Sequence, residues 1–154
     1  MKTRVIGLGN SILTDDGVGM AVVTELQKLP TGEGPDAVRS QAAGLELLEL
    51  MSGWDRVILV DAIKFDDLEP GTIVRIDPAD LRTSLRLRSV HEIDLPTALA
   101  FGRTLNIPMP GEVMVVGIQA DDTLTFGETL TPALAEAVAP AVDLVLQLSK
   151  GDQA

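Results

Sequence analysis

The sequence predicts an α/β protein whose mostly parallel sheet lies between helices, in a three-layer sandwich. Short apolar runs alternate with helical patterns along the chain, as in repeated strand–helix–strand units. Residues 57–60 are apolar on both faces, which is typical of a central parallel strand covered by helices on each side. A glycine-rich loop over residues 7–19 follows the first apolar run, where open α/β sheets bind ligands. The chain has 154 residues, so we expect a single domain spanning 1–154.

The helical and strand patterns give the expected elements in order. Val18, Val22 and Leu26 recur on one helical face, and Pro30 follows them, which predicts a first helix over about 16–29. Thr14 or Asp15 is the expected cap of this helix. The remaining expected helices are 44–52, 94–105 and 131–148, and the expected strands are 4–8, 36–40, 57–60, 72–76 and 113–117.

Two of these elements carry further expectations. Residues 72–76 alternate in polarity, which predicts an edge strand, whereas the strand at 57–60 is expected to end at Asp61. Pro132 suits the first turn of the last helix, and Pro140 is a candidate kink within it.

Composition excludes several classes of function. The net charge is −11, and such a surface repels phosphate backbones, so we expect no nucleic-acid partner. Cysteine is absent, which removes disulfides, thiolate metal sites and cysteine nucleophiles. No apolar run is long enough to predict a membrane span and no leader pattern is seen, so we expect a cytoplasmic protein.

The loop after the first strand favours a metal ion over a phosphate group. It carries Asp15 and Asp16 and no cation, whereas a phosphate-binding loop has glycines and a lysine. Asn10 is expected to orient this loop by bonding to its amides. Asp15 is expected to cap the helix rather than to bind a ligand.

Asp16, Asp61 and the single histidine, His91, form a candidate metal and catalytic set. If the first and third strands are neighbours, both carboxylates lie at one edge of the sheet, and a loop histidine can reach that edge. Two oxygen donors and one nitrogen suit a borderline divalent ion such as zinc or nickel. Each residue also has a structural interpretation: a first-turn acid for Asp16, a turn former for Asp61 and a surface loop position for His91.

Several motifs of the chain together resemble those of the nickel-iron hydrogenase maturation endopeptidases. The first and most specific is Gly7-x-Gly9-Asn10-x-x-Leu13-x-Asp15-Asp16-Gly17-x-Gly19. The others are Asp61-Ala62 after an apolar strand, Ser89-x-His91 before a Leu-Pro segment, and Val116-Gly117-Ile118. The resemblance covers nearly the whole chain, from residue 4 to about 148.

This resemblance implies a five-stranded twisted sheet flanked by helices and an endopeptidase activity. Family members clip a C-terminal extension from the precursor of a hydrogenase large subunit after nickel has been inserted. The family's nickel-contacting residues fall on Asp16, Asp61 and His91. The nickel ion belongs to the substrate, and its recognition reports that the metal has been loaded. A metal held by these residues is expected to polarise the scissile carbonyl or to activate a bound water.

The chain departs from the family pattern at two places, of which the second bears on substrate choice more than on reaction type. The first metal-contacting acid is Glu in some relatives, whereas Asp16 is shorter by one carbon–carbon bond, about 1.5 Å. Many relatives carry Asp-Gly-Gly-Thr after the second strand, where this chain has residues 39–44, including Gln41.

Three other functions fit parts of the sequence. A non-catalytic, metal-checking chaperone of the immature subunit would use the same residues without cleavage. A peptidyl-tRNA hydrolase-like esterase also begins Gly-Leu-Gly-Asn, but it needs a histidine soon after the loop and a basic face for tRNA. A metallohydrolase with its own zinc would retain that metal on purification.

Overall fold

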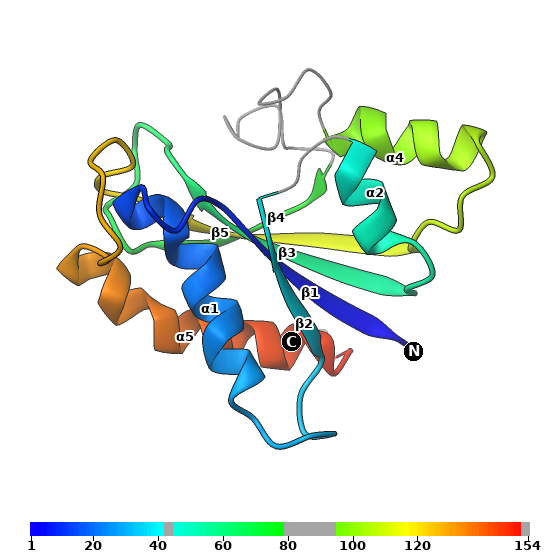
Figure 1. Cartoon of the computed structure of the whole chain (residues 1–154), viewed down its shortest axis with the longest axis horizontal. Coiled ribbons are helices and arrows are strands. Elements are labelled where there is room, and N and C mark those ends of the chain that lie inside the picture. The colour runs from blue at the N-terminus through cyan, green and yellow to red at the C-terminus, as the bar shows by residue number, and fades with distance from the viewer. Residues whose placement is uncertain (42–44, 79–94, 152–154) are drawn as a thin grey trace.

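The computed structural model describes residues 1–41, 45–78 and 95–151, and Figure 1 shows how its elements are arranged. The strands are β1 (Thr3–Leu8), β2 (Asp36–Ser40), β3 (Arg56–Ile63), β4 (Ile73–Ile76) and β5 (Glu112–Gln119). The helices are the 3₁₀ turn η1 (Thr14–Gly17), α1 (Val18–Gln27), α2 (Leu45–Met51), α4 (Leu95–Thr104) and α5 (Pro132–Ser149).

The five strands form one sheet in the order β2-β1-β3-β5-β4. β1, β2, β3 and β5 are parallel, and β4 pairs with β5 in the antiparallel direction at one edge. The predictions of a mostly parallel sheet and of an edge strand near 72–76 are therefore confirmed. β1 lies beside β3, as the candidate site requires.

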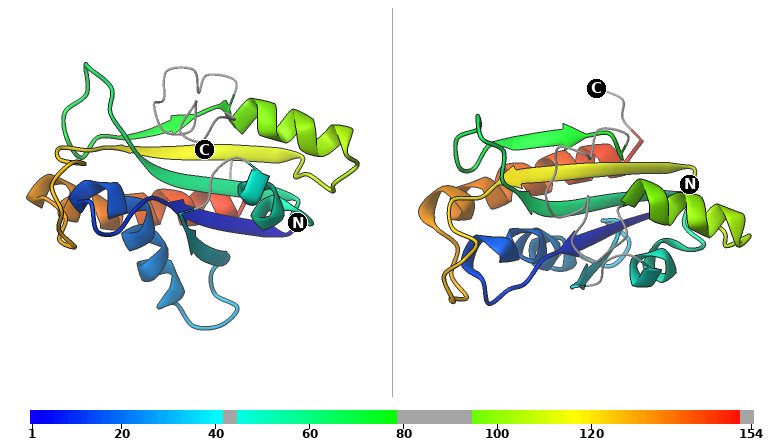
Figure 2. Two further views of the ribbon diagram at one scale, coloured as in Figure 1. Left: turned by 45° about the horizontal axis from the view of Figure 1, so that its top comes forward. Right: turned by 90° about the horizontal axis from the view of Figure 1, so that it is seen from above.

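Helices cover both faces of the sheet, which confirms the three-layer arrangement (Figure 2). Successive residues of β3 point to opposite faces and supply two separate cores. Ile58 and Val60 pack with the apolar sides of α1 and α5. Val57 and Leu59 pack with α2 and α4. β3 is buried along its whole length, as its uninterrupted apolar run predicts.

Two predicted boundaries are wrong. β3 does not end at Asp61, because Asp61, Ala62 and Ile63 all continue the pairing with β5. The helix predicted over 16–29 is a 3₁₀ turn followed by α1, which ends at Gln27. Asp16 therefore lies in a 3₁₀ turn and Asp61 within a paired strand, so the backbone of both site carboxylates is held by regular structure.

α5 is the longest helix in the described part of the chain, and it begins with Pro132 in its first turn, as predicted. By length and composition it is also the one described helix apolar enough to cross a membrane. Its inner side nevertheless packs into the core that α1 shares. The buried residues on that side are Leu134, Ala137, Ala141, Val145 and Leu148.

Candidate functional site

The loop that carries Asp16 folds back onto the end of β1. Gly9 has a φ of 142°, and a Cβ atom there would collide with the carbonyl oxygen of Asp16, so only glycine fits. Asp16 Oδ2 accepts a 3.0 Å hydrogen bond from the Asn10 N–H. Asn10 Oδ1 in turn accepts a hydrogen bond from the Ile12 N–H at 3.1 Å. The predicted orienting role of Asn10 is confirmed, and Asp16 is held with 1% of its surface exposed.

Asp61 lies at the point where β1 stops pairing with β3. Gly7 is the last β1 residue paired with β3, and its partner is Val60, the residue before Asp61. The Asp61 side chain is buried, and its Oδ1 accepts a 2.8 Å hydrogen bond from the Ala62 N–H. The turn η1 contacts β3, so Asp16 and Asp61 come to the same carboxyl edge of adjacent strands. This placement agrees with the sequence analysis, whereas the ligand roles of the two residues stay predictions.

His91 lies outside the described residues, so its position relative to the two carboxylates stays a prediction. Ser89 and residues 42–44 of the divergent loop also lie outside the described residues. Within residues 1–41, 45–78 and 95–151, no group of three or more metal-binding side chains lies close enough together to hold an ion.

Asp15 does not cap α1, contrary to the prediction. The cap position of α1 is Gly17, and no side chain bonds to the helix start there. The Asp15 carboxylate instead accepts backbone hydrogen bonds from Asp121, Asp122 and Thr131, at 2.9, 2.9 and 2.8 Å. Asp15 is fully buried, and a buried carboxylate is stable only when hydrogen-bonded in this way. It therefore ties the loop after β1 to the loop after β5.

Backbone bonds extend this connection into a paired loop structure. Leu13 and Gly127 form a parallel bridge, and the Thr14 N–H donates to the Gly127 carbonyl at 2.9 Å. Thr14 has a φ of 53°, a left-handed conformation that is uncommon for a residue with a side chain. Its hydroxyl also donates to the Thr125 carbonyl at 2.5 Å. The two loops lie side by side at the end of the molecule opposite the N-terminus (Figure 1).

Sequence reasoning missed this second loop. Asp121 and Asp122 follow a strand at its carboxyl end, which is the signal that singled out Asp61. Asp122 Oδ1 accepts hydrogen bonds from the Leu124 and Thr125 N–H groups at 2.9 and 3.0 Å. Hydrogen bonds from the Thr125 side chain, then from the Thr125 and Leu124 backbones, lower the pKa of Asp122 below its ordinary value of 3.8. Asp122 thus organises the loop after β5.

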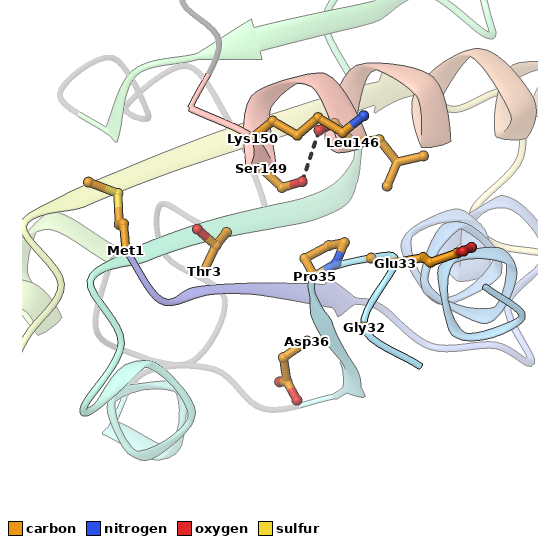
Figure 3. A pocket seen from close by; sticks show the side chains of 10 residues that line it. Met1, Thr3, Gly32, Glu33, Pro35, Asp36, Leu146, Ser149 and Lys150 are labelled. Carbon is orange, nitrogen blue, oxygen red and sulfur yellow. Dashed lines mark hydrogen bonds between the residues drawn. The ribbon is translucent and has the colours of Figure 1, made fainter. Parts of the chain in front are cut away.

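A pocket of about 340 Å³ lies elsewhere on the molecule (Figure 3). Met1, Thr3 and Asp36 line it at the amino ends of β1 and β2, together with Ser149 and Lys150 at the end of α5. Parallel strands run away from this edge, so the pocket is at the other end of the sheet from Asp16 and Asp61. It is therefore separate from the candidate site.

Comparisons with known proteins agree on one family. A family model described as hydrogenase maturation protease matches residues 21–148, a range that includes Asp61 and His91 but begins after Asp16. A Methanocaldococcus jannaschii relative that carries the family's name is 33% identical, over 96% of this chain and 94% of its own. The hydrogenase 2 maturation protease of Escherichia coli is 28% identical, over 95% of this chain and 89% of its own.

Solved structures lead to the same group of proteins. The fold is similar to the hydrogenase maturating endopeptidase HybD from Escherichia coli, with a TM-score of 0.81 and 28% identity. The alignment covers 99% of this chain and 94% of that one. A solution structure of an Escherichia coli endopeptidase aligns with a TM-score of 0.76 at 25% identity, over 99% of this chain and 94% of its own.

Proposed function

This chain belongs to the hydrogenase maturation protease family, and from that premise we propose that it is an endopeptidase acting on a hydrogenase large-subunit precursor. It removes the C-terminal extension of the precursor once nickel has been loaded, and it works in the cytoplasm. Asp16, Asp61 and His91 recognise the nickel ion, which is part of the substrate.

The observation that carries this proposal is the pairing of two buried carboxylates at one sheet edge. Asp16 and Asp61 are each about 1% exposed, and they come from segments 45 residues apart in the chain. The carboxyl ends of adjacent parallel strands are where open α/β sheets bind their ligands. Carboxylate oxygens placed there provide part of a ligand set for a divalent cation.

The covalent chain supports His91 as the third member. His91 is four residues before Leu95 in the sequence. The Leu95 side chain packs in the same core as Ile63 of β3. Asp61 alternates onto that same face of the sheet, two positions before Ile63. Leu95, at the start of α4, therefore packs on the face of the sheet on which Asp61 lies.

The nickel of the substrate and the site residues have different roles in the reaction. Nickel bound to the precursor supplies a Lewis acid near the scissile peptide. Asp16 and Asp61 hold the loaded subunit at the sheet edge, and the bond from Asn10 fixes the Asp16 carboxylate. Because the metal arrives with the substrate, the free enzyme is expected to leave other proteins intact.

The test is to incubate the protein with nickel-loaded and nickel-free precursor and to weigh the products. We expect cleavage of the loaded precursor only, and no cleavage by Asp61→Asn or His91→Ala at unchanged circular dichroism. Equal cleavage of both precursors would overturn nickel recognition. Full processing by both variants would overturn the ligand assignment. Binding of loaded precursor without any change in mass would identify a chaperone instead.

A further inference from the structure

Three large apolar side chains are exposed on the paired loops beside the candidate site. Leu124 and Phe126 are 87% and 80% exposed, and Ile12 is 46% exposed. We call these three residues the loop patch. Large apolar side chains that are exposed together mark interaction sites, because they leave apolar area in water. None of the three belongs to either core of the described residues.

The two loops that carry the loop patch are hydrogen-bonded to each other. Ile12 and Phe126 each immediately precede a member of the Leu13–Gly127 bridge, so they are neighbours across the pair. The Gly127 N–H donates to the Ile12 carbonyl at 2.9 Å. The backbones that carry Ile12 and Phe126 are thereby held side by side.

The loop patch is also held in place before any partner arrives. The Asp122 carboxylate accepts a hydrogen bond from the Leu124 N–H, and the Asp15 carboxylate accepts one from the Asp122 N–H. Thr14 joins the two loops through its N–H and its hydroxyl. A surface ordered in advance loses little conformational entropy on binding, which favours affinity.

The position of the loop patch identifies its occupant. Ile12 is four residues before Asp16 on the same loop, so the patch and one of the site carboxylates share one loop. The acids on the second loop are Asp121, Asp122 and Glu128, against one lysine, Lys64, which donates to the Asp121 carbonyl at 2.8 Å, in a chain of net charge −11. An apolar segment flanked by Lys or Arg is complementary to this surface, because its apolar side chains match the patch and its basic side chains match the acids.

We infer that the loop patch formed by Ile12, Leu124 and Phe126 is the docking surface for an apolar, basic-flanked segment of the precursor next to the cleaved bond. The inference rests on the proposed protease function. Substrate affinity then depends on residues that take no part in the chemistry, and these residues set which precursor is accepted.

The test compares two double variants that each replace two exposed apolar residues. Leu124→Ser/Phe126→Ser alters the loop patch, whereas Phe101→Ser/Leu105→Ser alters residues of 44% and 53% exposure at the end of α4. Cleavage rates are measured over a range of nickel-loaded precursor concentrations, and the Kd of the precursor is measured by calorimetry. We expect the patch variant to raise KM and Kd about tenfold or more with kcat unchanged, and the control to match the wild type.

The outcomes separate this inference from the proposed function. If the wild type cleaves and the patch variant keeps its KM and Kd, the docking surface is wrong and the protease function stands. If the wild type binds precursor without cleaving it, the protease function is wrong, and the Kd ratio alone decides the docking surface. Equal losses in both double variants, or a wild-type dimer that the patch variant abolishes, would also overturn the inference.

Discussion

Asp15 and Thr131 are 116 residues apart in the chain, yet the Asp15 carboxylate accepts hydrogen bonds from both the backbone N–H and the hydroxyl of Thr131. Thr131 is the cap residue of α5, and its side chain bonds to Asp15 rather than to its own helix. The start of α5 is thus fixed to the turn that presents Asp16. The loop geometry at the site depends on this contact between two segments that are distant in the sequence.

Replacement of Asp15 by Ala should lower the free energy of unfolding by about 3 kcal/mol, because partly buried backbone N–H groups lose a charged acceptor. Three backbone N–H groups are affected, those of Asp121, Asp122 and Thr131. Urea denaturation measures the change. Glu128→Ala, which removes an exposed acid from the same loop, is the control and should change stability by less than about 0.5 kcal/mol. Equal effects of the two variants would contradict the structural role of Asp15.

Replacement of Asp16 by Asn should abolish cleavage without unfolding the loop. The amide oxygen of Asn can still accept the hydrogen bond from the Asn10 N–H, so only the negative charge is lost. We expect the rate of precursor cleavage to fall by roughly a hundredfold or more, with the thermal midpoint within a few degrees of the wild type. A nearly normal rate would show that Asp16 serves only the structure of the turn.

Replacement of Gly19 by Ala should separate α1 from the sheet. A Cβ atom on Gly19 would lie 2.6 Å from the Leu8 carbonyl oxygen and closer still to that of Val60, and backbone atoms cannot yield easily. We expect a loss of several kcal/mol of stability, about 3 kcal/mol or more, or insoluble protein. Gly111→Ala is the matched control, since no atom lies within 4 Å of the added carbon. Soluble Gly19→Ala protein of wild-type stability would disprove the close packing.

Acid should loosen the loop after β5 through Asp122. Its pKa is lowered in the folded protein, so the ionised group stabilises the loop fully above the unfolded pKa of about 3.9 and ceases to do so as pH falls through the folded value. NMR titration of the Asp122 side chain should give a midpoint below 3.8, and the Leu124 and Thr125 amides should shift with it. In Asp122→Asn this transition of the two amides should disappear. A midpoint at or above 3.8 would contradict the hydrogen-bonded turn.

Local sequence patterns were enough to predict the elements of the fold. The apolar run at 57–60 specified a buried parallel strand, and the alternating residues near 72–76 specified an edge strand. These features depend on periodicity and burial, which a single sequence displays directly. The end of β3 was less predictable, because pairing with β5 carries the strand past a polar residue that by itself resembles a stop.

The sequence by itself determined the fold class, the family resemblance and the two strand-end acids, because apolar periodicity and motif spacing are local properties of the chain. Only the tertiary structure decided what Asp15 does, since the same residue type caps a helix or joins two loops according to which backbone amides lie nearby. It also decided that Ile12 and Phe126 are neighbours, because contacts between residues more than a hundred positions apart depend on sheet order and loop pairing, which no local pattern encodes.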